Sequence, residues 1–239
     1  MNEKKLACLD LGNTSSHMGI FHGMTCLKSE KVVTSSFIEN PMYLLPQDRE
    51  DYIISYCSVV PEAEKALRSI ISKDRIFCLR DENCLDIPIS YPNPTEIGAD
   101  RLANSIAAYS KYRLPVVIID IGTATTFDIV SEKGGYEGGV IAPGPQGYLD
   151  FLAQNTALLP HVLIQNDYYP SSAIGKNTPD AMLLGVHFGF EPMVKGILEN
   201  LISELKVLKN EKLQVLVVGG AARLLSSNNV IQCPLLTLE

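Results

Sequence analysis

The 239-residue sequence lacks the basic clusters that nucleic-acid binding requires. Its formal net charge is −7 at pH 7 and its pI is near 5.2. A protein that binds a nucleic-acid backbone neutralises the phosphates with grouped Lys and Arg side chains, and the sequence has no such group. We therefore expect no nucleic-acid partner. An acidic chain can still bind a nucleotide, because backbone N–H groups, Mg²⁺ and a few local cations suffice for that.

Patterned cysteines and histidines are also missing. The six cysteines are scattered without a C-x-x-C pair, and the four histidines lack the spacing of metal ligands. In a chain of this length, such cysteines are typical of reduced thiols in a cytosol. The sequence therefore offers no disulfide framework, no zinc site and no local Ser-His-Asp or Cys-His set.

Long hydrophobic runs are a third absence. The longest, such as Val116–Ile119, have the length of a strand, whereas a membrane-spanning helix needs about 20 apolar residues. The segment Met1–Asp10 has no signal-peptide core. We expect a cytoplasmic protein without a membrane partner.

The sequence does contain a repeated pattern. Leu6–Ser16 and Val116–Thr126 each consist of an apolar run, Asp, an apolar residue, Gly, and then small hydroxyl-bearing residues. Each pattern predicts a strand, a tight turn and a second strand. The two aspartates, Asp10 and Asp120, are 110 residues apart, which is close to half the chain. The repetition predicts two similar folding units, 1–113 and 114–239, with no flexible linker between them.

The rest of the chain alternates between strand and helix signals. This alternation predicts an α/β architecture with mixed sheets. Outside the two hairpins, the predicted strands are 53–60 and 213–218, and the predicted helices are 61–71, 99–112, 148–158, 179–208 and 221–225.

The two Asp-x-Gly turns have the chemistry of a phosphate site. A turn of Gly and small hydroxyl residues presents consecutive N–H and O–H donors to an anion. The Asp at the strand end supplies a carboxylate for Mg²⁺ or its waters. One such turn is a common structural motif, but two at matching positions predict a pair that holds a nucleotide's phosphates from both sides. A Walker loop at Lys176 is excluded, because Asn177 replaces the required Ser or Thr and Pro170 stands where the first Gly belongs.

Gly98-Ala99-Asp100-Arg101 begins a predicted helix after an extended, Pro-rich segment. Spacing alone leaves two interpretations open. In the first, Asp100 interacts favourably with the helix dipole and Arg101 is its exposed partner. In the second, Asp100 orients and deprotonates a substrate hydroxyl while Arg101 meets an anionic group. Phosphoryl transfer needs mainly such positioning and charge neutralisation.

Two other glycine-rich segments suggest close approach to a ligand. Residues 134–144 contain five glycines and are expected to form a loop whose backbone approaches a ligand. Gly219-Gly220 lies between a predicted strand and a predicted helix, where an adenine or ribose would have room against the backbone. Either pattern also occurs as an ordinary turn.

Taken together, these motifs resemble the type III pantothenate kinases. The resemblance covers nearly the whole chain, and the combination is specific although each piece alone is not. The matching pieces are Asp10-Leu11-Gly12-Asn13-Thr14, Ser58-Val59-Val60-Pro61, Tyr91, Gly98-Ala99-Asp100-Arg101, Asp120 to Thr126, Gly138 to Gly144, Gly175 to Thr178 and Gly219-Gly220. Two segments depart from the usual pattern. Ser15-Ser16-His17 stands where many relatives carry Asn, an apolar residue and often Lys, and Pro145 stands where an apolar residue is usual.

The resemblance implies a duplicated, actin-like fold of the ASKHA (ribonuclease H-like) type, working as a homodimer. It implies ATP-dependent phosphorylation of pantothenate to 4'-phosphopantothenate, the first step of coenzyme A biosynthesis. The residues it implies for ATP are Asp10, Leu11, Gly12, Asn13, Thr14, Ser15, Ser16, His17 and Thr123. Those it implies for pantothenate are Tyr91, Gly98, Ala99, Asp100, Arg101 and Thr178, with Asp100 as proton acceptor. Mg²⁺ would accompany ATP, and Asp120 would bind a monovalent cation, K⁺ or NH₄⁺.

Two other functions stay open at this point. The same fold serves other small-molecule kinases and phosphatases, because the fold fixes only the phosphate end of the site. Some relatives are accessory factors in gene regulation. That function predicts lost carboxylates and a basic chain, whereas Asp10, Asp100 and Asp120 are all present and the chain is acidic.

Overall fold

The computed structural model of the chain describes residues 5–80, 87–164, 170–205, 213–225 and 230–239. By contacts between Cα atoms, the chain divides into two compact units. Unit 1 comprises Met1–Arg113, Val130–Glu137 and Leu235–Glu239, and unit 2 comprises Leu114–Ile129 and Gly138–Pro234. Each unit is built on a five-stranded sheet.

The sheet of unit 1 has the strand order β3-β2-β1-β4-β5. Its strands are β1 (Lys5–Leu11), β2 (Ser15–His22), β3 (Thr25–Val33), β4 (Tyr52–Ser58) and β5 (Ile76–Cys78). β1 and β2 form the predicted antiparallel hairpin, while β4 pairs parallel to β1 on its other side. The sheet is therefore mixed, with β1 at its centre.

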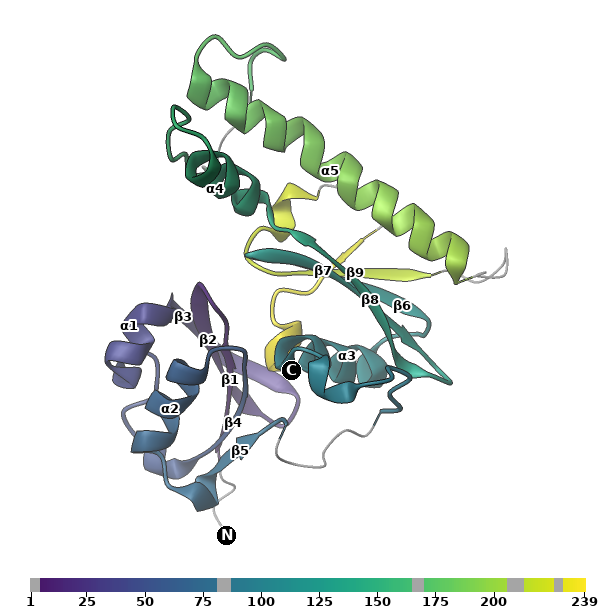
Figure 1. The fold of residues 1–239 in the computed structure, drawn as a ribbon. Helices are drawn as coiled ribbons and strands as arrows, with labels where there is room; N and C mark the ends of the chain where they lie inside the picture. The colour runs from purple at the N-terminus through teal and green to yellow at the C-terminus, as the bar shows by residue number, and fades with distance from the viewer. Residues whose placement is uncertain (1–4, 81–86, 165–169, 206–212, 226–229) are drawn as a thin grey trace. The chain divides into compact units, whose positions relative to one another are not determined.

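Helices α1 (Thr34–Glu39) and α2 (Pro61–Ile70) cover one face of this sheet (Figure 1). Side chains alternate along a strand, so every second residue of β1 faces these helices. Leu9 and Leu11 are buried in that core together with Phe37 of α1 and Leu67 of α2. Helix α3 (Ala99–Lys111) also belongs to unit 1.

The second sheet repeats the first. Its strands are β6 (Val116–Ile121), β7 (Ala124–Ser131), β8 (Gly135–Pro143), β9 (Gln214–Val218) and β10 (Ile231–Gln232). Its order, β10-β9-β6-β7-β8, again places the first strand at the centre, the next two on one side and the last two on the other. β9 pairs parallel to β6, as β4 pairs to β1. The predicted duplicated α/β architecture with mixed sheets is confirmed.

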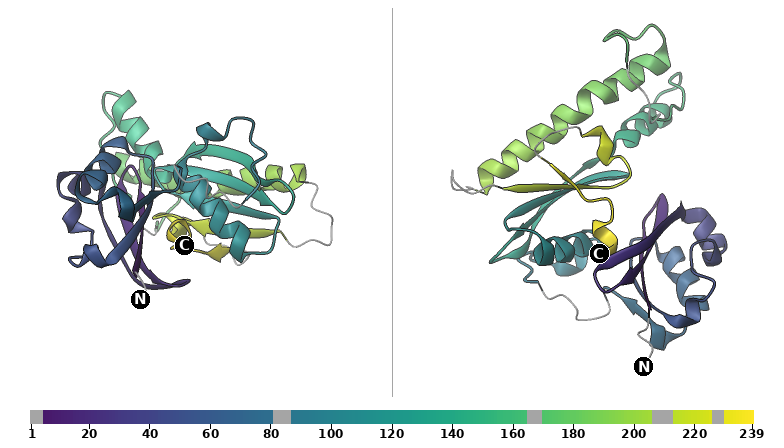
Figure 2. Two further views of the ribbon diagram at one scale, coloured as in Figure 1. Left: turned by 90° about the horizontal axis from the view of Figure 1, so that it is seen from below. Right: turned by 180° about the vertical axis from the view of Figure 1, so that it is seen from behind.

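Helices α4 (Pro145–Asn155) and α5 (Thr178–Glu204) cover one face of the second sheet (Figures 1 and 2). Val186 and Phe190 of α5 are buried there against Ile119 of β6 and Val217 of β9. Short 3-10 turns complete the described elements at Pro41–Tyr43, Arg49–Asp51, Lys73–Arg75, Pro94–Glu96, Ala222–Leu224 and Leu236–Leu238.

Helix α5 differs from the sequence expectation about long apolar segments. It is long and apolar enough to cross a membrane by length and composition, although less than a third of its most apolar stretch is buried. The expectation considered only uninterrupted runs, and charged residues such as Glu191 and Lys195 interrupt this one. Among the residues that the structure describes, α5 is therefore the one helix that passes the length and composition test.

Two expected elements also differ. Residues 135–143, predicted as a glycine-rich loop, form strand β8. The last predicted helix is a single 3-10 turn at Ala222–Leu224. The predicted end of α5 near residue 208 lies outside the described residues, and the helix is described to Glu204.

Candidate active site

The first Asp-x-Gly turn joins β1 to β2 in unit 1, and Asp10 lies at its base. Asp10 is opposite His17 in β2 and Cys57 in β4, so these three side chains share the sheet face that lies away from α1 and α2. The Cys57 thiol donates a hydrogen bond to Asp10 Oδ1, with a sulfur–oxygen distance of 3.6 Å. Burial raises the pKa of Cys57 well above its usual value, and the charges of Asp10 and Asp100 raise it further. The thiol therefore stays protonated and serves as a donor.

The pKa of Cys57 depends on both predicted functional carboxylates. Both Asp10 and Asp100 act electrostatically on the buried Cys57 thiol, although they come from β1 and α3. The Asp10 carboxylate at the base of a glycine-containing turn fits Mg²⁺, which takes one or two protein carboxylates and completes its shell with phosphates and water.

The turn itself is held by its carbonyl groups. Val59 N–H donates to the Leu11 carbonyl at 3.1 Å, and Thr34 N–H donates to the Thr14 carbonyl at 3.1 Å. The Thr34 hydroxyl donates to the Gly12 carbonyl at 2.5 Å. The predicted Asn13 and Thr14 are exposed at the tip, whereas Leu11 is buried and its side chain belongs to the core.

His17 is half-buried, and its buried Nε2 atom has no hydrogen-bond partner among the residues that the structure describes. Burial, and to a smaller extent the charge of Lys31, lowers the pKa of His17 from 6.5 to about 4. Lys31 lies opposite His17 in β3. The imidazole beside the turn is therefore neutral at pH 7 and cannot supply the positive charge of the lysine that relatives often carry there.

Gly98 and Asp100 lie in close contact at the start of α3. Asp100 Oδ1 accepts a hydrogen bond from the Arg101 N–H at 2.8 Å, so the carboxylate folds back over the first turn of the helix. A Cβ atom at Gly98 would lie 2.4 Å from that oxygen. The glycine therefore makes room for the carboxylate, which sequence spacing alone could not reveal. Ala99, between them, is buried.

Tyr136 lies beside two of the residues predicted for the acceptor, Tyr91 and Arg101. Its ring is fully buried and lies 5.9 Å from the ring of Tyr91, edge to face. The Arg101 guanidinium carbon lies 5.8 Å from the centre of the same ring. Sequence pattern alone does not reveal this contact, because Tyr136 lies in a glycine-rich segment far along the chain from Tyr91 and Arg101. The five residues predicted for the acceptor between Tyr91 and Arg101 all belong to unit 1, where Tyr91 and Arg101 lie beside the Tyr136 ring.

The second Asp-x-Gly turn lies in unit 2, between β6 and β7. Asp120 is half-buried at the end of β6, and Thr123 is exposed in the turn. Gly219 has a φ of 95°, and a Cβ atom there would lie 2.5 Å from Asp120 Oδ1. Gly144 donates its N–H to the Thr123 carbonyl at 3.0 Å. Both glycines are thus explained by close contact with this turn.

The predicted approach of a ligand to residues 134–144 has a different physical basis. A Cβ atom at Gly139 would lie 1.7 Å from the Phe127 carbonyl oxygen, and one at Gly135 would lie 1.9 Å from the Pro88 carbonyl oxygen. These glycines allow backbone segments to approach each other. The many glycines of this segment do mark close contacts, and the contacts that the structure describes are between backbone segments of the chain itself.

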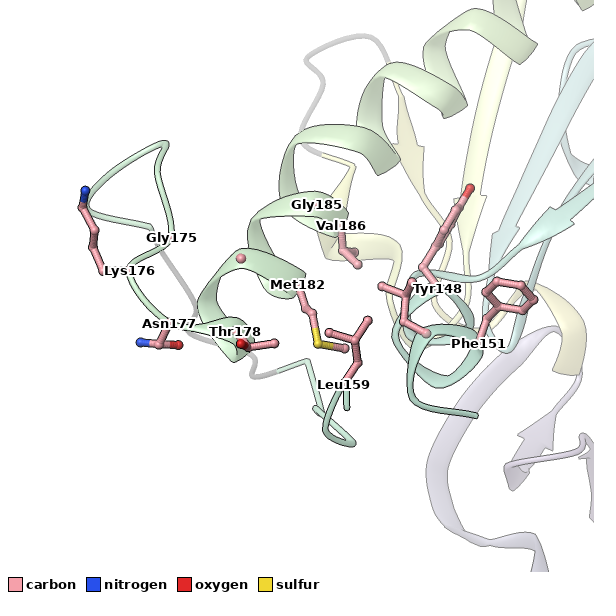
Figure 3. A pocket seen from close by; sticks show the side chains of 12 residues that line it. Tyr148, Phe151, Leu159, Gly175, Lys176, Asn177, Thr178, Met182, Gly185 and Val186 are labelled. Atoms are coloured by element: carbon pink, nitrogen blue, oxygen red, sulfur yellow. The ribbon is translucent and has the colours of Figure 1, made fainter. Parts of the chain in front are cut away.

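Thr178 is the first residue of α5, in unit 2. The preceding Asn177 caps the helix, because its Oδ1 accepts from the Asp180 N–H at 2.9 Å. Thr178 and Lys176 border a cavity of about 730 Å³ between α4 and α5. Its wall is largely apolar, with Tyr148 from α4 and Met182 from α5 (Figure 3). Within the described residues, no group of three or more His, Cys, Asp or Glu side chains is placed to hold a metal.

Solved structures with a similar fold have low sequence identity. A conserved Campylobacter jejuni protein assigned to the Baf family of transcriptional activators is 21% identical with a TM-score of 0.60, over 97% of this chain and 92% of that one. Component A of (R)-2-hydroxyglutaryl-CoA dehydratase from Acidaminococcus fermentans is 13% identical with a TM-score of 0.55, over 98% and 93%. These likenesses concern the fold, and they confirm the predicted actin-like (ASKHA) class.

Sequence relatives are much closer. A type III pantothenate kinase of Methylacidiphilum infernorum is 39% identical over 221 residues, which cover 92% of this chain and 79% of that protein. Another, from Desulfosudis oleivorans, is 33% identical and covers 98% of this chain and 96% of its own length. The family model described as type III pantothenate kinase matches residues 6–200. The chain belongs to the type III pantothenate kinase family.

Proposed function

We propose that this protein transfers the terminal phosphoryl group of ATP to the primary hydroxyl of pantothenate. The product is 4'-phosphopantothenate, and the reaction begins coenzyme A biosynthesis. The observation that carries the proposal, beside family membership, is the joint effect of Asp10 and Asp100 on the Cys57 thiol. The candidate nucleotide turn and the candidate base belong to the same unit.

The nucleotide site is proposed at the first turn. The residues are Asp10, Leu11, Gly12, Asn13, Thr14, Ser15, Ser16 and His17, with Thr123 from the second turn. Backbone N–H groups at the tip of the turn would donate to phosphate oxygens. Leu11 and Ser16 are buried, so we assign them backbone and supporting roles.

The acceptor site is proposed around the start of α3. Asp100 would accept the proton of the pantothenate hydroxyl, since a positioned carboxylate suffices when the main task is orientation and charge neutralisation. Tyr91, Gly98, Ala99 and Arg101 would hold the rest of pantothenate. Thr178, at the N-terminus of α5, would complete that set.

Two kinds of cation are proposed. Mg²⁺ bound by Asp10 together with the phosphates would neutralise charge on the transferred group. A monovalent cation, K⁺ or NH₄⁺, would be held by the Asp120 carboxylate. The position of the Asp120 carboxylate, an oxygen ligand near the end of β6 and beside the second turn, supports the monovalent cation site.

We further propose that the two halves, 1–113 and 114–239, are the two ASKHA halves, and that the enzyme is a cytoplasmic homodimer. Exposed apolar side chains near α4 and α5 support self-association; they are Phe151, Leu158, Ile174 and Phe188. A partner membrane is not needed to explain α5, because Val186, Phe190 and Val194 are buried in the core of unit 2. Nucleic acid is not a proposed partner, because the chain carries a net charge of −7.

The test is a coupled assay with ATP, Mg²⁺, K⁺ and pantothenate, in which mass spectrometry identifies the product. We expect pantothenate-dependent turnover by the wild-type protein and a loss of about 100-fold or more in kcat for Asp100→Asn. Glu62→Gln is the matched control, because Glu62 is an exposed carboxylate in the first turn of another helix, α2.

Three outcomes would contradict the proposal. Absence of turnover with pantothenate, together with phosphorylation of another alcohol or hydrolysis of ATP, would indicate another kinase or phosphatase on this fold. Absence of both nucleotide binding and turnover would indicate a non-catalytic protein. A wild-type kcat in Asp100→Asn would show that Asp100 is not the base, although pantothenate would remain the substrate.

A further inference from the structure

The first turn needs more than glycine and small residues to bind an anion. Its N–H groups attract phosphate oxygens, but its carbonyl groups repel them. A useful turn must therefore direct its carbonyls away from the ligand and satisfy them elsewhere. Three carbonyls in the turn and at its edge, those of Leu11, Gly12 and Thr14, accept hydrogen bonds from within unit 1.

Two of these three carbonyls depend on one residue. Thr34 donates its N–H to the Thr14 carbonyl at 3.1 Å and its hydroxyl to the Gly12 carbonyl at 2.5 Å. Thr34 is the first residue of α1, directly after β3, and only 2% of it is exposed. Thr34 therefore contacts the turn from the protein interior and not from the solvent side.

The direction of a further hydrogen bond follows from counting protons. The Ser16 and Thr34 hydroxyl oxygens are 3.1 Å apart, and either atom could donate by geometry alone. A hydroxyl has one proton, and Thr34 uses its proton on Gly12. Ser16 must therefore donate to Thr34, which gives a chain from Ser16 to Thr34 to the Gly12 carbonyl.

This chain assigns Ser16 a supporting role. Ser16 is fully buried, and its register partner is Leu11, whose side chain faces the core. The Ser16 proton is used inside the protein, so its hydroxyl has no proton left to donate to a phosphate. Chained hydroxyls also polarise one another, which strengthens the final bond to the turn.

We propose that Thr34 is a positioning residue for the nucleotide phosphates, with Ser16 as its support. By binding the carbonyls of Gly12 and Thr14, Thr34 holds the N–H groups of the turn in the orientation that an anion needs. The inference rests on the proposed nucleotide site. It assigns Thr34 no contact with substrate.

Thr34→Val tests the inference, because valine keeps the branched shape and the backbone N–H and removes only the hydroxyl. We expect the Kd for MgADP, measured by titration calorimetry, and the KM for ATP to rise about 5- to 20-fold, as the loss of a buried hydrogen bond implies. The KM for pantothenate should change less than about twofold. Thr34→Ser, which keeps the hydroxyl, should bind MgADP with a Kd close to that of the wild type. A merely structural role would not separate the two substrates in this way.

The matched control is Thr25→Val, at the exposed far end of the same strand, β3, which should bind MgADP like the wild type. If Thr34→Val fails to fold, Ser16→Ala replaces it, with an expected rise in the Kd for MgADP of about 2- to 5-fold. Unchanged nucleotide binding in the folded Thr34→Val protein, an equal rise in both KM values, or no rescue by serine would overturn the inference. So would a wild-type protein that binds no MgADP. A wild type that binds MgADP but does not phosphorylate pantothenate would overturn only the proposed acceptor, and the calorimetric comparison would still decide the role of Thr34.

Discussion

Single residues in unit 1 take their roles from the strand face they occupy. Leu11 and Ser16 point to the core, whereas Asp10, His17 and Cys57 share the opposite face. Because side chains alternate strictly, a shift of one residue in the register would exchange these two sets. The sequence predicted the turn from its residue types. It could not predict that Thr34, 20 residues beyond Thr14, completes it, because that contact arises only when β3 folds back.

Gly98 is expected to control the position of the candidate base. Gly98→Ala should lower kcat about 10-fold or more, because the new Cβ would displace Asp100 Oδ1, from which it would be only 2.4 Å away. The backbone at Gly98, with φ −57° and ψ 142°, is open to alanine, so the free energy of unfolding should change by less than about 1 kcal/mol. Steady-state kinetics and urea denaturation measure the two effects. Equal losses in activity and stability would contradict this explanation.

His17 is expected to make stability depend on pH. Its pKa is lowered to about 4 in the fold, so between pH 4 and 6.5 the unfolded chain binds a proton that the folded chain does not. Stability is therefore retained above pH 6.5 and falls as the pH drops through this window. Asp10 and Lys31 are the charged register neighbours of His17. Urea denaturation of metal-free protein at pH 7 and 4.5 should show about 1–3 kcal/mol more loss in the wild type than in His17→Gln. Parallel pH profiles for the two proteins would refute this.

Elements with local signals were predictable, and those defined by distant contacts were not. Pro61 at the start of α2 and the apolar face of α3 gave both helices to within one residue at most of their ends. Strand β8 was mistaken for a loop, because its glycines suggested a turn. These positions need glycine because the backbone carbonyl groups of Phe127 and Pro88, which lie in other segments, pass close to them. Strand β3 was missed because most of its side chains are exposed, so it lacks an apolar alternation.

Strand β8 provides a test of the close-approach explanation. Gly139→Ala should lower the free energy of unfolding by about 3 kcal/mol or more, because its Cβ would collide with the Phe127 backbone. Gly147→Ala in α4 is the matched control. There a Cβ has ordinary contacts of 3.7 Å and longer, so the change should be neutral or stabilising by up to about 1 kcal/mol. Similar effects in both variants, measured by urea denaturation, would show that backbone proximity does not explain Gly139.

At the scale of the whole molecule, the duplication was visible in the sequence because both central strands end in the same Asp-x-Gly pattern. The same strand order in both sheets confirms it. The return of the last residues to unit 1 was not visible. Thr237 donates a hydrogen bond to Asn104 at 2.8 Å, and Lys111 pairs with Glu239 at 3.0 Å. No local pattern predicts pairings across more than 120 residues.

The proposed homodimer predicts the mass of the protein in solution. Light scattering after size-exclusion chromatography should give twice the 26.2 kDa of one chain at micromolar concentration. Phe188→Ser, on the exposed face of α5, should shift this mass toward that of one chain, because it removes an exposed apolar side chain from the proposed interface. A mass of 26.2 kDa for the wild type would refute the dimer.

The return of residues 235–239 to unit 1 has a consequence for how the protein is made. Leu236 and Leu238 are buried, and they belong to the unit that contains β1. The ribosome therefore makes the first Asp-x-Gly turn more than 200 positions before the residues that complete the core of its unit. Unit 2 lies almost entirely between those two events. During synthesis, unit 1 therefore keeps an incomplete core until residues 235–239 have been added, by which time unit 2 has been made.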